Sequence, residues 1–121
     1  MGDRLIGVGG DITLPYLGLN EADLATVTTE CEVLINNAAS VDFTERLDNA
    51  VRINTLGPFN LVQLAKACPR LEICTHVSTA YVNCNKPGGY IEEKIYDDLD
   101  IDVESFIDNV LSMSEEQVEV E

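Results

Sequence analysis

The stretch EVLINNAASVDF, residues 32–43, decides how this chain folds. Within its first four residues, 32–35, the last three form a short apolar run, which is typical of a strand buried on both faces of a parallel sheet. The run ends abruptly in Asn36, Asn37, Ala38 and Ala39, whose side chains are amides or very small. Either the strand stops there at a turn, or something flat has to lie against that backbone.

The rest of the chain alternates between short apolar runs and longer periodic segments. Beside the strand at 32–35, these patterns predict strands at 5–12 and 71–78, helices at 19–29, 44–68 and 101–111, and a loop at 85–89. Gly57-Pro58 predicts a kink or break in the long helix, which Pro69 ends. The alternation predicts an α/β fold, a doubly wound parallel sheet of the Rossmann-like kind, present in part. All three strands should end along one edge, where open α/β sheets bind ligands.

The charge is distributed unevenly. The 121 residues fit one small domain or part of a larger one, and their formal net charge is −15. Residues 97–121 carry ten of the 22 acids and no base, so residues 1–96 carry the other 12 acids and all seven Lys and Arg. We expect a folded domain in 1–96 and an acidic extension in 97–121 that is helical or poorly ordered. This balance argues against nucleic-acid binding, which needs a basic surface.

Membrane and metal sites are also not expected. No run approaches the roughly 20 apolar residues of a membrane span, and the N-terminus lacks the apolar region of a signal peptide, which predicts an intracellular protein. The four cysteines form no C-x-x-C pair and His76 is the single histidine, so no zinc site can be assembled. We expect reduced, buried thiols, with a disulfide framework as the alternative.

Three clusters of small or polar residues follow the three predicted strands. They are Gly9-Gly10-Asp11-Ile12, Asn36-Asn37-Ala38-Ala39-Ser40 and Ser78-Thr79-Ala80-Tyr81. Each alone is explained by a turn, a helix cap or a hydroxyl-stabilised turn. Their shared position at the ends of successive strands predicts a ligand site, where small side chains let a ligand approach the backbone. Asn54 lies inside the long helix, where an amide is out of place unless something buried needs it.

These motifs resemble the middle of an alcohol-forming fatty acyl-CoA reductase. The resemblance is carried by GDI, by LINNAASVDFTERLDNAVRINTLGPFNLVQLAKACPRLEICTHVSTAYVN and by GYIEEKIY, and it covers about residues 8–96. That family belongs to the extended branch of the short-chain dehydrogenase/reductase superfamily. The resemblance implies that NADPH reduces a long-chain acyl-CoA to an aldehyde and then to a fatty alcohol. It also implies that the parent enzyme is associated with the endoplasmic reticulum or the peroxisome.

The resemblance implies a role for each matching residue. Asp11 and Ile12 match the pair that flanks the adenine ring of the cofactor. The stretch Asn37, Ala38 and Ala39 matches the backbone along which the cofactor lies. Asn54 matches a helix asparagine that supports the active site. Thr79, with Ser78 as second choice, matches the hydroxyl that polarises the substrate carbonyl, while a tyrosine beside a lysine delivers the proton.

Parts of this reductive machinery are not found in the sequence. Gly7-Val8-Gly9-Gly10 is not the glycine-rich fingerprint, because G-x-G-x-x-G would need glycine in place of Ile12. Residues that bind the 2′-phosphate of NADPH are missing too. Tyr90 and Lys94 have the Y-x-x-x-K spacing, but they follow a Pro-Gly-Gly loop, so we do not assign them the proton-donor role. We therefore expect a fragment that has no reductase activity alone.

Two alternatives stay open beside the acyl-CoA reductase. A thioester reductase or a sugar-nucleotide epimerase shares the same superfamily core. The chain could also be a non-catalytic binding fragment that kept the fold and lost the chemistry. Titration with NADPH distinguishes a retained cofactor pocket from this last alternative. The sequence does not indicate an oligomeric state.

Overall fold

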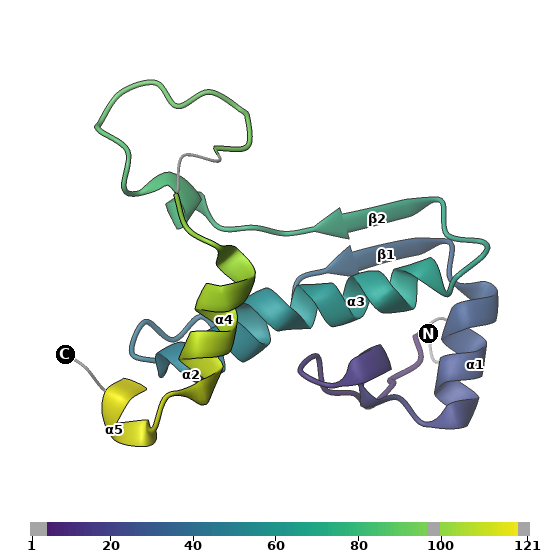
Figure 1. Cartoon of the computed structure of the whole chain (residues 1–121). Helices are drawn as coiled ribbons and strands as arrows, with labels where there is room; N and C mark the ends of the chain where they lie inside the picture. Colours follow the sequence, from purple (N-terminus) through teal and green to yellow (C-terminus); the bar gives the residue numbers. More distant parts are fainter. Residues whose placement is uncertain (1–4, 97–99, 119–121) are drawn as a thin grey trace.

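The structure, a computed structural model, describes residues 5–96 and 100–118 (Figure 1). Its elements are η1 (Pro15–Gly18), α1 (Glu21–Glu30), β1 (Val33–Asn36), α2 (Leu47–Val51), a π-helical stretch (Arg52–Leu56), α3 (Gly57–Lys66), β2 (Ile73–His76), η3 (Ala80–Asn83), α4 (Val103–Ser112) and α5 (Glu115–Val118), where η1 and η3 are 3-10 helices. β1 and β2 pair in parallel, from Val33 opposite Ile73 to Asn36 opposite His76. The predicted α/β class is therefore confirmed, and so are the strands near 32–35 and 71–78.

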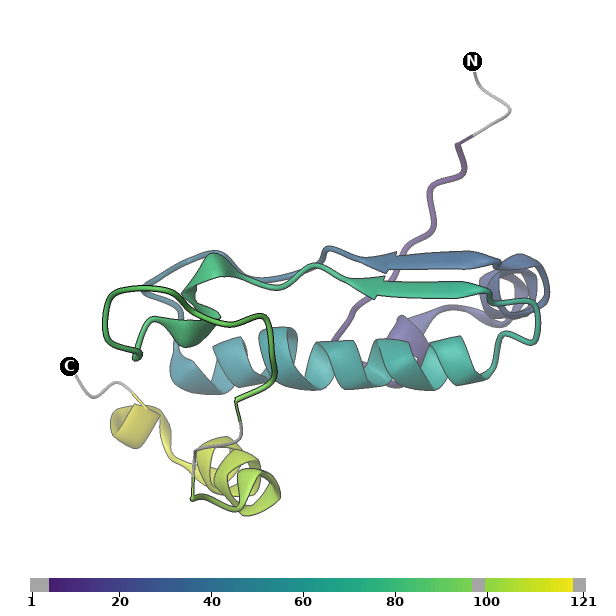
Figure 2. The same cartoon turned by 90° about the horizontal axis from the view of Figure 1, so that it is seen from above.

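Helix α3 covers one face of the two-stranded sheet (Figure 2). Side chains alternate between the faces of a strand, and Leu34 and Asn36, 9% and 2% exposed, are the buried pair in β1. Val33 and Ile35 lie in the alternate positions and are 53% and 65% exposed. Burial of this strand on both faces, as predicted, is therefore wrong for the described residues, because a helix packs against one face alone.

The long helix predicted at 44–68 forms with a change of geometry in its middle. It begins at Leu47, and α2 passes through the π-helical stretch Arg52–Leu56 into α3 without a gap. Pro58 has no N–H to donate to the carbonyl four residues earlier, and its ring would collide with that carbonyl in a regular α-helix. A wider π turn just before Pro58 removes this conflict. The predicted irregularity is confirmed as a π turn that keeps the helix continuous.

Residues 5–11 form no strand, so the strand predicted at 5–12 is wrong. A parallel strand needs a hydrogen-bonding neighbour, and a cavity lies between Val8 of this segment and Ile35 of β1. The backbone bonds close a local turn instead, with Asp11 N donating to Leu17 O at 2.7 Å and Leu14 N donating to Asp11 O at 3.1 Å. The described part of the chain therefore contains two of the three predicted strands.

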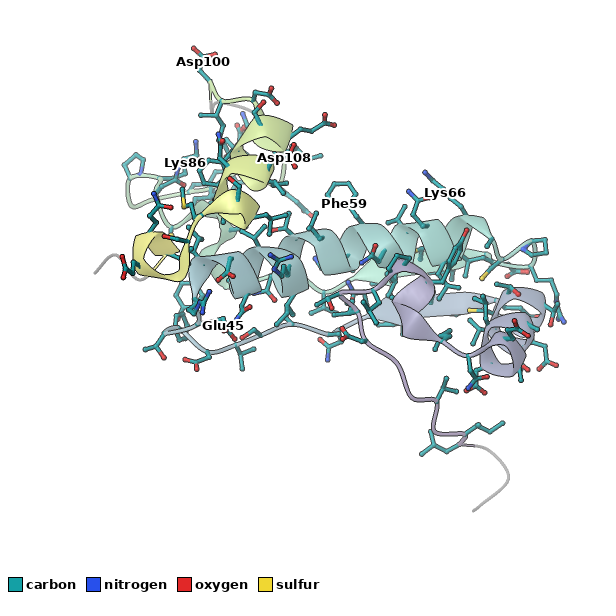
Figure 3. All side chains as sticks on the ribbon, turned by 60° about the horizontal axis from the view of Figure 1, so that its bottom comes forward. Glu45, Phe59, Lys66, Lys86, Asp100 and Asp108 are labelled. Atoms are coloured by element: carbon teal, nitrogen blue, oxygen red, sulfur yellow. The ribbon has the colours of Figure 1, made fainter. Side chains whose placement is uncertain are left out.

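The two predicted outer helices are confirmed as α1 and α4. The Asn20 carboxamide caps α1 by accepting a hydrogen bond from Asp23 N at 3.0 Å. α4 packs against α2 and buries Val110, which is 1% exposed, while Asp100 and Asp108 point outward (Figure 3). Of the predicted acidic extension, residues 97–99 and 119–121 lie outside the described residues. None of the helices that the structure describes is long and apolar enough to cross a membrane.

Candidate functional site

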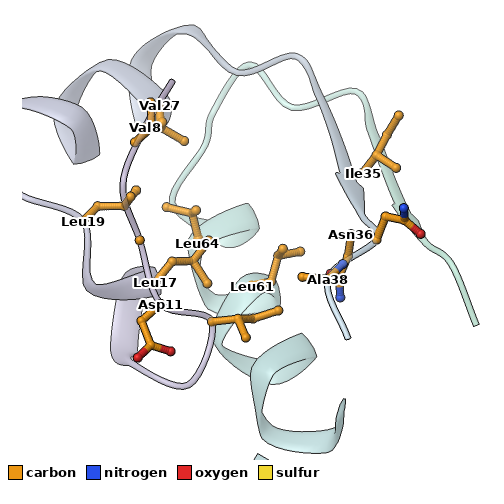
Figure 4. A pocket seen from close by; sticks show the side chains of 13 residues that line it. Val8, Asp11, Leu17, Leu19, Val27, Ile35, Asn36, Ala38, Leu61 and Leu64 are labelled. Carbon is orange, nitrogen blue, oxygen red and sulfur yellow. The ribbon is translucent and has the colours of Figure 1, made fainter. Parts of the chain in front are cut away.

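Two cavities meet at the end of β1. The first, about 540 Å³, lies between the turn at 10–19, α3 and the end of β1 (Figure 4). The second, about 700 Å³, lies between the loop at 37–43 and the segment at 76–81 that follows β2. Asn37 and Ala38 line both cavities. A ligand that spans the two would therefore cross the stretch where the strand changes to amide and alanine residues.

Asp11 is presented to the first cavity by a tight turn. Its Oδ1 accepts hydrogen bonds from Thr13 N at 2.8 Å and from Thr13 Oγ1 at 2.7 Å. These two bonds, that of the Thr13 hydroxyl above all, hold the pKa of Asp11 below its usual range. Asp11 therefore stays ionised, and its Oδ2 has no donor among the described residues. That oxygen remains able to accept a hydrogen bond from a ligand.

The turn behind Asp11 is unusually compact. Tyr16 and Leu17 have φ of 49° and 59°, a left-handed conformation that costs non-glycine residues free energy. This conformation places Leu17 O against Gly10, where an added Cβ would lie 2.8 Å from that oxygen. Glycine at position 10 is thus required by the close approach that also lets Asp11 N bond to Leu17 O.

Ile12 is fixed against helix α3 from two directions. Asn60 Nδ2 donates to Ile12 O at 3.0 Å. A Cβ on Gly57 would lie 2.9 Å from Ile12 Cγ1, so the side chain of Ile12 packs directly on the helix backbone. Gly57 therefore matters for the site as well as for the helix, because its missing side chain leaves room for Ile12 at the end of the π turn.

The loop at 37–43 is held at its start and at its middle by two asparagines. Asn36, at the end of β1, accepts a hydrogen bond from Ala38 N through Oδ1 at 3.2 Å. Asn54, in the π-helical stretch, accepts from Ser40 N at 2.9 Å and donates to Ser40 O at 3.1 Å. The sequence led us to expect that the Asn54 amide binds a buried group. It binds the backbone of an exposed loop instead, and Asn54 is itself exposed. The loop keeps its shape while Asn37, Ala38 and Ala39 stay exposed.

Two hydroxyls lie on the wall of the second cavity. Thr79 Oγ1 accepts a hydrogen bond from Tyr81 N at 3.2 Å and so caps η3. Because the hydroxyl accepts there, its own proton stays available for an acceptor in the cavity. Ser78 precedes it on the same wall. The rings of Phe43 and Tyr81 meet edge to face, with centroids 5.8 Å apart, and link the two loops that bound this cavity.

All eight predicted site residues line one cavity or both. Asp11 and Ile12 lie in the first, Ala39, Asn54, Ser78 and Thr79 in the second, and Asn37 and Ala38 in both. Sequence reasoning missed His76 and Phe43, which also line the second cavity. The parallel register, which places His76 opposite Asn36, could have indicated His76, whereas Phe43 comes from an irregular loop that carries no such signal.

Tyr90 and Lys94 form no catalytic pair in the structure. They lie in a segment without helix, and Tyr90 is 91% exposed. Lys94 Nζ is 2.6 Å from Glu92 Oε2 and 5.1 Å from the centre of the Tyr96 ring. This geometry gives no reason to assign the proton-donor role to Tyr90 and Lys94.

Comparison with known proteins identifies relatives of the chain. The model of an NAD-binding family described as "Male sterility protein" matches residues 1–119. The chain is 38% identical over 94 residues to fatty acyl-CoA reductase 1 of Arabidopsis thaliana, covering 77% of this chain and 19% of the relative. It is 42% identical over 90 residues to the chloroplastic fatty acyl-CoA reductase 2 of that plant, covering 74% and 15%. To human fatty acyl-CoA reductase 1 it is 34% identical over 94 residues, covering 78% and 18%. The chain spans 15–19% of the length of these relatives.

Proposed function

Because the chain belongs to the NAD-binding family described as male sterility protein, we propose that it forms the cofactor-side wall of a reductase that acts on long-chain acyl-CoA thioesters. One hydride and the loss of coenzyme A would give the aldehyde, a second hydride would give the fatty alcohol, and the cofactor is NADPH. Three relatives named fatty acyl-CoA reductases support this substrate class. The single structural observation that carries the proposal is the meeting of two cavities at Asn37 and Ala38.

The donors and acceptors in these cavities fit the two ends of a nicotinamide dinucleotide. The free Oδ2 of Asp11 suits the amino group of an adenine, and the flat stretch at Ala38 and Ala39 suits a ring that lies against backbone. Each cavity has a volume in the ordinary range of ligand pockets, about 300–1,000 Å³. No Lys or Arg lines either cavity within the described residues, so these walls do not neutralise the pyrophosphate.

We assign each predicted residue a role on this basis. Asp11 and Ile12 hold the adenine end, and Asn37, Ala38 and Ala39 form the surface along which the cofactor lies. Asn54 keeps that surface in shape through Ser40. Thr79 is the hydroxyl that donates to the substrate carbonyl, with Ser78 as the second choice. Within the parent enzyme, residues 1–96 form part of a doubly wound Rossmann-like domain and 97–121 an acidic extension.

The chemistry assigned to these residues is electrostatic. The reduced nicotinamide supplies a hydride when it is bound. Negative charge would then develop on the thioester oxygen, and the Thr79 hydroxyl could donate a hydrogen bond to that oxygen. The backbone bond from Tyr81 N orients the hydroxyl before any substrate arrives, which is the condition for effective stabilisation of a developing charge. For the parent enzyme we keep the prediction of an intracellular location at the endoplasmic reticulum or the peroxisome; one relative is named chloroplastic.

The proposal is tested by titrating the purified chain into NADPH and, in parallel, into NADH, and following nicotinamide fluorescence. We expect saturable binding of NADPH, weakened about tenfold or more by Ala38→Leu, because extra methylenes in a filled contact cost about 1–3 kcal/mol. Ala22→Leu, on the exposed face of α1, is the matched control and should bind like the unsubstituted chain. The absence of binding would contradict the proposal and favour a non-catalytic protein. Equal binding by both variants would also contradict it, because the cofactor would then lie away from Ala38.

A further inference from the structure

His76 and Asn36 face each other across the parallel strands at the point where the two cavities meet. Asn36 Nδ2 lies 3.0 Å from His76 Nδ1. Asn36 is 2% exposed and lines the first cavity, whereas His76 lies on the wall of the second. One contact thus joins the two walls, and the function proposed above assigns neither residue a role.

The orientation of the Asn36 carboxamide is decided by its second partner. Amide oxygen and nitrogen are assigned from the hydrogen bonds around them. Ala38 N–H can only donate, and it lies 3.2 Å from Oδ1 of Asn36. The opposite orientation would place two donors face to face at Ala38. Nδ2 of Asn36 therefore points to His76 and donates a hydrogen bond.

This orientation fixes the proton on the imidazole ring. A neutral histidine carries its proton on one ring nitrogen and accepts at the other. Nδ1 of His76 accepts from Asn36, so the proton is on Nε2. Nε2–H has no protein acceptor among the described residues, and the ring lies on the wall of the second cavity. A ligand oxygen in the second cavity can supply that acceptor.

We propose that Asn36 is a positioning residue that sets His76 as an Nε2–H donor to a ligand oxygen in the second cavity, a contact that rests on the function proposed above. The oxygen belongs either to the cofactor or to the acyl thioester, since both offer the same acceptor chemistry. The same carboxamide holds Ala38 N, so one buried side chain prepares both the surface for the cofactor and the donor for the ligand.

The test uses the single histidine of the chain, whose ring nitrogens give unambiguous signals in long-range nitrogen–proton NMR spectra. In the neutral imidazole of the unsubstituted chain we expect a protonated Nε2 and an unprotonated Nδ1. Asn36→Asp is the decisive variant, because its carboxylate can still accept from Ala38 N but presents an acceptor to His76. It should place a proton on Nδ1 of His76. A merely structural role of Asn36 predicts no such switch. An Nδ1–H ring before substitution, or an unchanged tautomer in Asn36→Asp, would overturn the pairing.

The donor role is tested by adding NADPH and a soluble acyl-CoA to separate samples. The expected result is a shift of the Nε2 signal with at least one of them, and the sample that shows it identifies the source of the oxygen. If the amides of Asn37, Ala38 and Ala39 shift while the imidazole does not, the donor role is wrong and the function proposed above stands. If no amide shifts with either ligand, that function and the donor role both fail, and the tautomer spectra still decide the Asn36–His76 pairing.

Discussion

Asn54 holds Ser40 by both of its backbone groups, accepting from Ser40 N at 2.9 Å and donating to Ser40 O at 3.1 Å. A residue of the π-helical stretch thereby shapes the loop that follows β1. Asn54→Ala removes both bonds, each worth about 1 kcal/mol, so we expect unfolding in urea to need about 2 kcal/mol less free energy. Asn109→Ala, at an exposed position of α4, is the control and should change stability by less than about 0.5 kcal/mol. Equal losses in both variants would show that the Ser40 contact contributes nothing.

Gly57→Ala should displace Ile12 rather than unfold α3. The new Cβ would lie 2.9 Å from Ile12 Cγ1, and overpacking of this kind costs about 1–3 kcal/mol. Alanine gains about 1 kcal/mol over glycine within a helix, so the net change in stability is small. The measurable effect is weaker NADPH binding together with shifted amide signals of Asp11 and Ile12. Gly9→Ala, where nothing lies within 4 Å of an added Cβ, should leave both unchanged. Unaltered signals in Gly57→Ala would contradict the close packing of Ile12.

Leu64 should be among the most sensitive positions in the core. It is 2% exposed and lines the first cavity, and Leu→Ala changes at such sites cost about 2–5 kcal/mol. Phe59 lies in the same helix but is 60% exposed and points outward (Figure 3), so Phe59→Ala should cost less than about 1 kcal/mol. Urea unfolding of the two variants measures the difference. A smaller loss for Leu64→Ala than for Phe59→Ala would mean that the core does not lie between α3 and β1.

Cys68 should react with alkylating reagents more slowly than Cys74 and Cys84. Burial, and next the Cys31 thiol beside it, raises the pKa of Cys68 above its ordinary value of 9.0, whereas Cys74 and Cys84 are exposed. The thiolate is the reactive form, so both access and ionisation disfavour Cys68. Peptide mapping after brief treatment with iodoacetamide measures the four rates, which should converge in urea. Equal rates in the folded chain would contradict the burial of Cys68.

The same shift has a consequence for stability at high pH. A raised pKa in the folded state means that the folded chain retains its proton where the unfolded chain loses it. The contribution of Cys68 is therefore fully present below the unfolded value of 9.0 and is lost as pH rises through the higher folded pKa. Urea midpoints should fall above about pH 9, and they should fall less in Cys68→Ala. An identical pH dependence in both would show that the thiol is not coupled to folding.

The chain alone should not reduce acyl-CoA. The sequence contains no glycine fingerprint, and Tyr90 and Lys94 do not form a helical pair, so we expect the described residues to supply neither a phosphate loop nor a proton donor. Incubation with NADPH and a long-chain acyl-CoA should yield neither aldehyde nor alcohol above the level given by Thr79→Ala. Product formed well above that control would contradict this expectation and would require a proton donor among the residues of this chain.

The sequence predicted those parts of the fold that are determined locally. Asn20 predicted the start of α1, because its side chain can accept a hydrogen bond from a free backbone N–H of the first turn. The apolar runs predicted β1 and β2. The prediction of a strand at 5–12 was wrong because a strand needs a hydrogen-bonding neighbour. The local sequence pattern does not show whether such a neighbour is present. The π turn was foreseen only as an irregularity at Gly57-Pro58, since its geometry depends on how the helix accommodates Pro58.

For the candidate site, the sequence indicated which residues line the cavities but not the contacts that hold them in place. The clusters that end the two strands gave Asn37 and Thr79, because strand ends of a parallel sheet share an edge. Asp11 also lines a cavity, but it does so from a turn and not from the end of a strand. The contacts that hold these residues were beyond sequence reasoning. Asn54 bonds to the backbone of Ser40, and any residue type at position 40 except proline could offer the same groups. His76 became visible only through the register that sets it opposite Asn36.

The most direct test of the central claim, that one dinucleotide spans both cavities, is a residue-resolved amide NMR titration of the chain with NADPH and with its two halves. Adenosine 2′,5′-bisphosphate should shift Asp11 and Ile12, nicotinamide mononucleotide should shift Ser78 and Thr79, and NADPH should shift both sets together with Asn37 and Ala38. If NADPH shifts one set alone, or if both halves shift the same residues, the two cavities do not form a continuous dinucleotide site.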